Sequence, residues 1–321
     1  MSVVRIKNLI IEMLDPVSTE KNLFISRFKA YMERCKKPRT KQIYHDTMKR
    51  VLEFDPKVET LSFDDIGKDW LVRFDSFLRG RNASQNTRCM HFRNLRAVFN
   101  DAIDNDITTA YPFRKFMVRS EETAKRAYSV DRLRELFNYP VDSPNAQRFV
   151  DMFKLIFFLV GINIVDLYNL RGITNGRIEY RRAKTSRLYS VKVEPEAMDI
   201  IERYRGRTHL LNLADIYKSS RTCMVAINKG LKLIGAHERS THRGREVLEY
   251  HPAFPDLSTY VARHTWATIA YELDIPNETI AAALGHSFGN RTTAIYIKNN
   301  NRKVDEANRR VIDYVLGNTV E

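Results

Sequence analysis

Three residues near the C-terminal end have types and spacing suited to phosphodiester chemistry: Arg263, His286 and Tyr296. Arginine offers a planar, permanently charged guanidinium to the negative charge that builds on phosphate oxygens under attack. Histidine can donate to the same oxygens or move protons. Tyrosine becomes a nucleophile when a cationic pocket favours its ionised form. Each residue alone more often packs or faces solvent, so the hypothesis of attack by Tyr296 rests on the ordered set.

Short predicted helices surround these residues and can bring them together. Arg263 falls in a helix that is expected to begin near Thr259. Pro276 suits the first turn of the next helix and Gly285 the position just after its end, so His286 follows a helix terminus. A side chain there can turn into a cleft. Because a further helical turn ends on the tyrosine, we expect the three residues to converge.

The composition indicates an intracellular protein with a polyanionic partner. The chain has 321 residues, a formal net charge of +14 and a pI near 9.6, which favours nucleic acid as the partner, although a generally basic protein has the same balance. The N-terminal apolar stretch is too short for a signal peptide or a membrane span. We expect a cytoplasmic, nucleoid-associated protein of a bacterium. The three cysteines have no disulfide or zinc spacing: Cys35, Cys89 and Cys223.

The pattern along the chain predicts a mainly α protein with a small β-sheet. Residues 1–15 form a short N-terminal segment, too short to fold alone, and residues 16–113 read as a helical bundle. Residues 114–127 are polar and without periodicity, so we interpret them as a linker. Residues 128–321 form a second domain of α+β type with a C-terminal tail helix. Alternating residues over 177–193 predict its sheet, and the rest reads as helices.

Two basic groups in the helical bundle are candidate DNA contacts. The first is a basic turn, and the second lies on a helix expected to begin after an N-cap at Ser84. For any single helix, an ordinary solvated face is the alternative. The candidates are Lys36, Lys37, Arg39, Lys41, Arg88, Arg93 and Arg96.

Five segments together resemble the tyrosine recombinases, also called the phage integrase family. Arg263–Thr268 reads Arg-His-Thr-Trp-Ala-Thr and Leu284–Ser287 reads Leu-Gly-His-Ser, each similar to a family box, with Tyr296 at the place of the nucleophile. Gly161–Arg171 resembles the box of the first catalytic arginine, and Arg182–Thr185 resembles the β-hairpin lysine motif. The resemblance covers most of the chain. It implies a helical core-binding (SAM-like) domain followed by an α+β catalytic domain.

The chain departs from the family pattern at two positions. Asn163 stands where the family has its first arginine, and Tyr260 stands where it has a histidine. Arg182 is a candidate substitute, because residues two apart in a strand face the same side and Lys184 is expected in the cleft. The equal alternative is that Arg182 is one more surface arginine beside Arg181 or contacts DNA outside the cleft. Tyr260 could donate its hydroxyl in place of the histidine. His264 is interpreted as structural.

The resemblance implies a mechanism and a set of partners. Tyr296 would form a 3′-phosphotyrosyl link, Arg263 and His286 with Arg182 would stabilise the transition state, and Lys184 would protonate the leaving 5′-oxygen. No metal or other cofactor is implied. The partners would be double-stranded DNA with a specific core site, further copies in a tetramer on paired sites, and an accessory DNA-bending protein. No membrane partner is expected.

Two other functions remain open at this point. An accessory DNA-binding factor of the same fold with an impaired active site would account for Asn163 and Tyr260, and a type IB topoisomerase-like enzyme shares the tyrosine chemistry. The short segment 1–15 favours a simple recombinase on short inverted core sites, acting in inversion, element mobilisation or dimer resolution. Val304, Ala307, Val311 and Val315 form an apolar stripe along the tail helix. By the family resemblance this helix is expected to dock on a neighbouring protomer, and packing on its own domain is the alternative.

Overall fold

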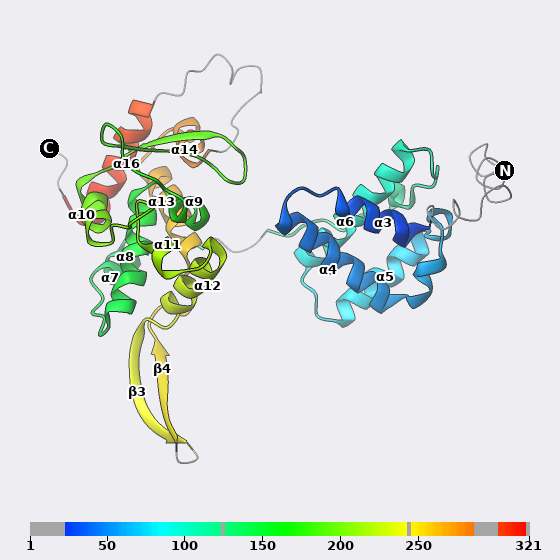
Figure 1. The fold of residues 1–321 in the computed structure, drawn as a ribbon, viewed down its shortest axis with the longest axis horizontal. Coiled ribbons are helices and arrows are strands. Elements are labelled where there is room, and N and C mark those ends of the chain that lie inside the picture. Colours follow the sequence, from blue (N-terminus) through cyan, green and yellow to red (C-terminus); the bar gives the residue numbers. More distant parts are fainter. Residues whose placement is uncertain (1–22, 123–125, 243–244, 286–300, 319–321) are drawn as a thin grey trace. The chain divides into compact units, whose positions relative to one another are not determined.

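The computed structural model describes residues 23–122, 126–242, 245–285 and 301–318, without the side chains of residues 241–247. The chain forms two compact units, Met1–Thr123 and Ala124–Glu321, and each is considered by itself (Figure 1).

The N-terminal unit is helical throughout its described part. Its elements are α3 (Phe24–Glu33), α4 (Pro38–Phe54), η1 (Pro56–Thr60), η2 (Phe63–Asp65), α5 (Lys68–Gly80), α6 (Gln85–Asp104) and η3 (Pro112–Lys115).

Local sequence signals set several of these boundaries. Pro38 opens α4, where the missing N–H costs nothing. Ser84 caps α6 by accepting from the Thr87 amide at 3.2 Å, as predicted. The sequence also predicts one continuous helix from Phe63 to Phe77, and this is wrong. A capping box between Ser62 and Asp65 closes a short 3₁₀ turn, and α5 begins only after an extended Gly67.

Aromatic side chains form the core of this unit. The rings of Phe24 and Phe63 meet edge to face with centroids 5.3 Å apart, and Phe63 and Phe99 meet in the same way at 5.0 Å. Such pairs stabilise beyond the area that they bury, by about 0.5–1.5 kcal/mol each. The contacts join α3, the η2 turn and α6, which are far apart in the sequence, so the rings fix how the bundle closes.

The second unit is an α+β assembly. Its elements are α7 (Val130–Phe137), α8 (Pro144–Phe158), α9 (Ile164–Tyr168), β1 (Arg177–Arg181), β2 (Leu188–Lys192), α10 (Pro195–Arg203), α11 (Leu213–Ile216), α12 (Ser220–Leu231), β3 (Gly235–His242), β4 (Arg245–Pro252), α13 (Thr259–Glu272), α14 (Asn277–Leu284) and α16 (Asn301–Leu316).

Helix α8 forms the centre of this unit because it is apolar on nearly all sides. Phe153 and Phe157 are fully buried on it, and it packs against α13, on which Trp266 is fully buried. A helix that is apolar all round is typical of a core element. The arrangement fixes α13, which carries Arg263, and the α8–α9 turn against each other.

The tail helix α16 packs on its own unit, where the sequence led us to expect docking on a neighbouring protomer. Ala307, Val311 and Val315 are buried against α7, α13, α14 and β2. Asn308 is also buried: it accepts from Trp266 Nε1 at 2.9 Å and donates to the Phe158 carbonyl at 2.9 Å. A buried amide with partners in its own core fixes the helix position, which a general apolar stripe cannot do.

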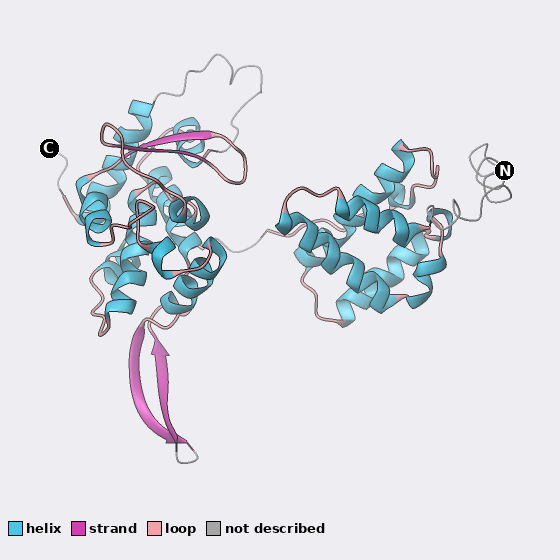
Figure 2. Cartoon of the chain, in the orientation of Figure 1, coloured by secondary structure: helices cyan, strands magenta, loops and turns pink. Residues whose placement is uncertain are grey.

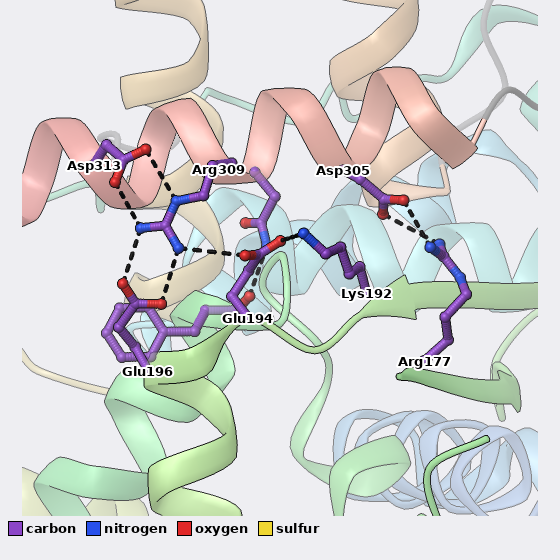
Figure 3. Close-up of polar contacts among 9 residues, drawn as sticks. Arg177, Lys192, Glu194, Glu196, Asp305, Arg309 and Asp313 are labelled. Carbon is purple, nitrogen blue, oxygen red and sulfur yellow. Dashed lines mark hydrogen bonds and ion pairs between the residues drawn. The ribbon is translucent and has the colours of Figure 1, made fainter. Parts of the chain in front are cut away.

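Charged residues close the outer side of the same contact (Figure 3). Arg309 on α16 donates to Glu196 at 2.9 and 3.0 Å and to Asp313 at 2.7 and 2.9 Å, and it approaches Glu194 at 3.3 Å. One guanidinium therefore joins α16 to the start of α10.

A second ion pair joins the tail helix to the hairpin (Figure 3). Arg177 on β1 donates to both oxygens of Asp305 on α16, at 2.7 and 3.1 Å. Bidentate pairing of this kind is directional, so it fixes an angle as well as a distance. The β1–β2 hairpin is thus held at its base by α16.

The structure contains a second pair of strands that the sequence analysis interpreted as helix. Strands β3 and β4 pair antiparallel, with Ala236 opposite His251 and Glu238 opposite Glu249, and form a ribbon that projects from the unit (Figure 2). The described side chains from Ala236 to Arg239 and from Leu248 to His251 are exposed. Without a buried face, the ribbon lacks the apolar alternation by which a strand is recognised in sequence.

Candidate active site

Arg263 is a buried arginine that donates hydrogen bonds to two backbone carbonyls. It lies on α13 with 8% of its surface exposed. Its Nη1 donates to the Gly161 carbonyl at 2.9 Å and its Nη2 to the Leu284 carbonyl. Gly161 has φ +65°, and a Cβ there would lie 2.7 Å from atoms of Arg263. Glycine is therefore required at this position both by the left-handed conformation and by the close approach of α13.

Arg182 reaches the same carbonyl oxygen from the β1–β2 hairpin. Its Nη1 lies 3.2 Å from the Leu284 oxygen. The sequence analysis placed Arg182 in a strand, and this is wrong, because β1 ends at Arg181 and β2 begins at Leu188. Arg182 begins the connecting loop, where its carbonyl accepts from the Ser186 amide at 2.8 Å and its amide donates to Arg187. The loop directs the side chain towards the end of α14.

Asp166 holds this loop in place. Its Oδ1 accepts from the Ala183 amide at 2.8 Å, and the residue is 5% exposed on α9. Burial raises the pKa of Asp166, while the Ala183 amide, Arg182 and Arg263 oppose that rise. The carboxylate thus connects the segment around residue 163 to the hairpin loop.

The site carries an excess of positive charge. Burial lowers the pKa of Arg263, and the like charge of Arg182 lowers it further. Two guanidinium groups share one neutral oxygen here, and Asp166 is the carboxylate whose charge acts on both. A buried charge is costly unless it is compensated, so the arrangement favours binding of an anion.

Other candidate residues occupy different positions around this pair. Asn163 is the N-cap of α9, where its Oδ1 accepts from the Val165 amide at 2.9 Å. Tyr260 is 49% exposed on α13, and its ring meets His264 edge to face at 4.6 Å. Lys184 is exposed in the hairpin loop.

Two of the predicted catalytic residues, His286 and Tyr296, lie outside the described residues. The chain is described as far as Gly285: α14 runs from Asn277 to Leu284, and Gly285 follows with φ +64°. This confirms the predicted helix and its left-handed glycine terminus. The Leu284 carbonyl that receives both arginines is therefore two residues before His286.

The candidate DNA contacts of the N-terminal unit separate into exposed and buried residues. Lys36, Lys37, Arg39 and Arg93 are exposed, and Lys41 lies 2.5 Å from Glu33. The Arg96 guanidinium lies over the Phe113 ring at 5.3 Å.

Arg88 does not have the position expected of a DNA contact. It is 6% exposed, and its Nη1 donates to both oxygens of Asp75 at 2.6 and 2.8 Å. The helix periodicity placed Arg88 with the solvent-facing cations, but the partner on α5 draws it into the core. We therefore reassign Arg88 to a buried ion pair.

One residue of the site was absent from the sequence analysis. Tyr189 on β2 places its hydroxyl 3.3 Å from the Leu284 oxygen and 3.4 Å from Arg182 Nη1. It lies five residues after Lys184 in a strand that the sequence did predict, and strand alternation alone does not tell which of its side chains reach α14. The signal in the sequence that could have identified Tyr189 was its closeness to the lysine motif of the hairpin.

A family model matches the N-terminal unit. Residues 23–118 match the family model described as Phage integrase SAM-like domain. No curated protein matches the sequence. None of the helices within the described residues is long and apolar enough to cross a membrane.

Solved integrase structures have a similar fold along nearly the whole chain. A lambda integrase dimer bound to a COC′ core site aligns with a TM-score of 0.63 at 15% identity, over 82% of this chain and 94% of that chain. A lambda integrase tetramer bound to a Holliday junction aligns at 0.64 and 15% identity, over 91% and 85%. The Tn1549 transposon integrase with transposon right end DNA aligns at 0.56 and 15% identity, over 90% and 99%.

The fold is therefore that of the solved lambda and Tn1549 integrases, which confirms the predicted fold class of a helical SAM-like domain and an α+β domain. The N-terminal unit contains the match to the phage integrase SAM-like domain, and the alignments with lambda and Tn1549 integrases extend over most of the chain.

Proposed function

We propose that the chain is a site-specific DNA recombinase that cleaves and rejoins DNA through a 3′-phosphotyrosyl intermediate. The observation that carries this proposal is the pair Arg182 and Arg263, which reach one carbonyl oxygen from two separate elements. Two guanidinium groups held this way suit the oxygens of a phosphate in its transition state. The tyrosine recombinase motifs supply the remaining chemistry.

The proposed roles follow from the chemistry of each side chain. Tyr296 attacks the scissile phosphorus and the 5′-oxygen leaves, so a 3′-phosphotyrosyl bond forms as the P–O5′ bond breaks. Arg263, Arg182 and His286 stabilise the developing charge. Lys184 supplies the proton to the leaving oxygen, for which an exposed place in the hairpin loop is suitable. The phosphotyrosyl bond conserves the energy of the broken bond, so rejoining needs no cofactor.

Asn163 and Tyr260 take minor roles in this proposal. The Asn163 Oδ1 is occupied as the cap of α9, so its contribution is to hold the box in place. Tyr260 is half exposed beside His264 and could donate its hydroxyl to the DNA backbone. Arg182 thus carries the charge of the missing first arginine.

We further propose that double-stranded DNA with a specific core site is the substrate and that four copies act together on paired sites. The net charge of +14 supports a DNA partner. Exposed Lys36, Lys37, Arg39 and Arg93, with Lys41 and Arg96, are the candidate contacts of the N-terminal unit. Residues 16–113 would bind the core site, 114–127 link the domains, and 128–321 carry the chemistry. An accessory DNA-bending protein and a cytoplasmic, nucleoid-associated site of action complete the proposal.

A suicide DNA substrate tests the proposal. The substrate carries a candidate core site from DNA flanking the gene, and the readout is a covalent protein–DNA adduct. We expect the adduct with the wild type, its loss in Tyr296→Phe, and a reduction of about 10²-fold in Arg182→Ala. Arg181→Ala is the matched control, because Arg181 is the exposed neighbour at the end of β1.

Each other outcome selects a different interpretation. An adduct that forms equally well in Arg182→Ala would show that Arg182 does not replace the missing first arginine. Specific DNA binding by the wild type without any adduct would favour an accessory factor. Relaxation of supercoiled DNA without strand exchange between paired sites would favour a topoisomerase-like enzyme.

A further inference from the structure

Three hydrogen-bond donors from three elements converge on the Leu284 carbonyl oxygen. They are Arg263 Nη2 from α13, Arg182 Nη1 from the hairpin loop at 3.2 Å, and the Tyr189 hydroxyl from β2 at 3.3 Å. A carbonyl oxygen has two lone pairs and no net charge. Three donors, two of them cationic, exceed what this acceptor can satisfy.

The Tyr189 hydroxyl is held at this point by its packing. Its ring stacks on Tyr180 with centroids 5.2 Å apart and planes 19° apart. The hydroxyl oxygen lies directly over Gly285, where a Cβ would come within 1.0 Å of it. The Leu284–Gly285 turn therefore fits the phenol because residue 285 is a glycine, independently of its left-handed φ.

A phosphate oxygen suits the three donors better than the carbonyl does. It carries negative charge, accepts up to three hydrogen bonds, and gains most from donors that are already oriented. The Leu284 carbonyl marks a position that all three donors can reach at once.

We propose that Tyr189 is a catalytic residue whose hydroxyl donates to a non-bridging oxygen of the scissile phosphate, beside Arg182 and Arg263. This inference rests on the proposed recombinase function. Tyr189 forms no covalent bond in this role, because its proton stays on the phenol and the hydrogen bond shortens as charge builds on the oxygen.

A purely structural role is the competing explanation. The last carbonyls of a helix have no partner within the helix, and cations near them are stabilising. The three donors could therefore serve only to terminate α14. In that case loss of the hydroxyl would change stability, and its effect on cleavage would not depend on the charge of the phosphate oxygen.

A substrate with a modified scissile phosphate separates the two explanations. Two suicide substrates carry the separated diastereomers of a methylphosphonate, in which one or the other non-bridging oxygen becomes a neutral methyl group. On ordinary phosphate we expect Tyr189→Phe to slow adduct formation by about 10²-fold, with DNA affinity unchanged. On one diastereomer, where the oxygen that accepts from Tyr189 is absent, the variant should match the wild type.

Tyr180→Phe is the matched control. It removes a hydroxyl from the stacked partner ring, so any effect of altered ring packing appears there as well. We expect its rate to stay close to that of the wild type on all three substrates. The same cleavage defect in both variants would overturn the assignment to Tyr189.

Further results would also overturn the inference. Cleavage of ordinary phosphate by Tyr189→Phe at the wild-type rate would exclude a catalytic hydroxyl. An equal defect on phosphate and on both methylphosphonates, with a lower melting temperature, would assign Tyr189 to the end of α14. Absence of an adduct with the wild type on ordinary phosphate would instead overturn the proposed function, and the inference with it.

Discussion

Each unit of this protein contains a buried arginine, and the two are compensated in opposite ways. In the N-terminal unit, Arg88 is 6% exposed and donates twice to the Asp75 carboxylate. In the second unit, Arg263 is 8% exposed, donates to two carbonyls, and lies beside a second arginine, Arg182. The two arginines are buried to nearly the same extent, so they differ in the groups that accept their hydrogen bonds.

This contrast teaches how to distinguish a structural arginine from one prepared for a ligand. A carboxylate neutralises Arg88, and removal of Arg88 would leave the buried Asp75 paired only with the exposed Arg79. Carbonyls satisfy the geometry of Arg263 without neutralising its charge. Binding of an anion would therefore offset the free energy that this excess charge costs the folded protein.

The largest effect on stability is expected from breaking the pair in the N-terminal unit. Arg88→Met should lower the free energy of unfolding by about 3–5 kcal/mol, because it leaves the Asp75 charge buried. Trp70 and Trp266 are the two tryptophans, one in each unit. Fluorescence in a Trp266→Phe background therefore follows unfolding of the N-terminal unit alone.

Arg79→Met is the control for this measurement. Arg79 pairs with the same carboxylate at 2.8 Å, but its side chain is 66% exposed. We expect a loss of about 1 kcal/mol or less. Equal losses in the two variants would show that burial does not distinguish the pairs.

The next largest effect is expected on catalysis at Arg263. Arg263→Met should slow adduct formation by about 10²- to 10³-fold, which corresponds to about 2.7–4 kcal/mol of transition-state stabilisation. The free energy of unfolding, followed through Trp266, should fall by less than in Arg88→Met, because the substitution also removes the repulsion from Arg182. A larger loss of stability than in Arg88→Met would make Arg263 a structural arginine and break the comparison.

A smaller effect is expected at the ion pairs of α16, as a change with pH. Arg309 lowers the pKa of Asp313 through their hydrogen bonds. A carboxylate with a lowered folded pKa stabilises the protein above its unfolded pKa of about 3.9, and this stabilisation is lost as the pH falls through the folded value. Arg309→Met should therefore cost about 1 kcal/mol at pH 7 and weaken the acid dependence of unfolding below pH ~4.

Lys303→Met serves as the control on the same helix, because Lys303 is exposed. Denaturant unfolding at several pH values measures both variants. If Arg309→Met and the wild type lose stability in parallel below pH ~4, the pairs around Arg309 do not carry the acid dependence.

The smallest effect is expected from shortening the β3–β4 ribbon. Ala236 and His251 face each other across the ribbon, so an Asn-Gly turn can join them in place of residues 237–250. Since the described side chains removed are exposed or half-buried, stability should change by no more than about 0.5 kcal/mol. Thermal unfolding measures this, and a cooperative loss of the whole unit would show that the ribbon is part of the core.

Several elements could be predicted because their signals are local. Ser84 caps α6 and Gly285 ends α14 in a left-handed conformation, and both followed from the residue type at a helix terminus. The β1–β2 hairpin followed from alternation. The ribbon β3–β4 has no buried face and so no alternation, and the one-helix interpretation of residues 63–77 missed the capping box that divides it.

The sequence by itself determined the class of protein, its two-part organisation and the residue types available for chemistry, because motifs, caps and charge are local or additive properties. The tertiary structure decided which arginine forms a buried ion pair and which arginines lie together at the candidate site. Arg88 was drawn inward by a carboxylate on another helix, while Arg182 and Tyr189 were brought to Arg263 by a hairpin loop and the turn at Gly285. Compensation of a buried charge depends on neighbours distant in the chain, and periodicity along one helix carries no information about them.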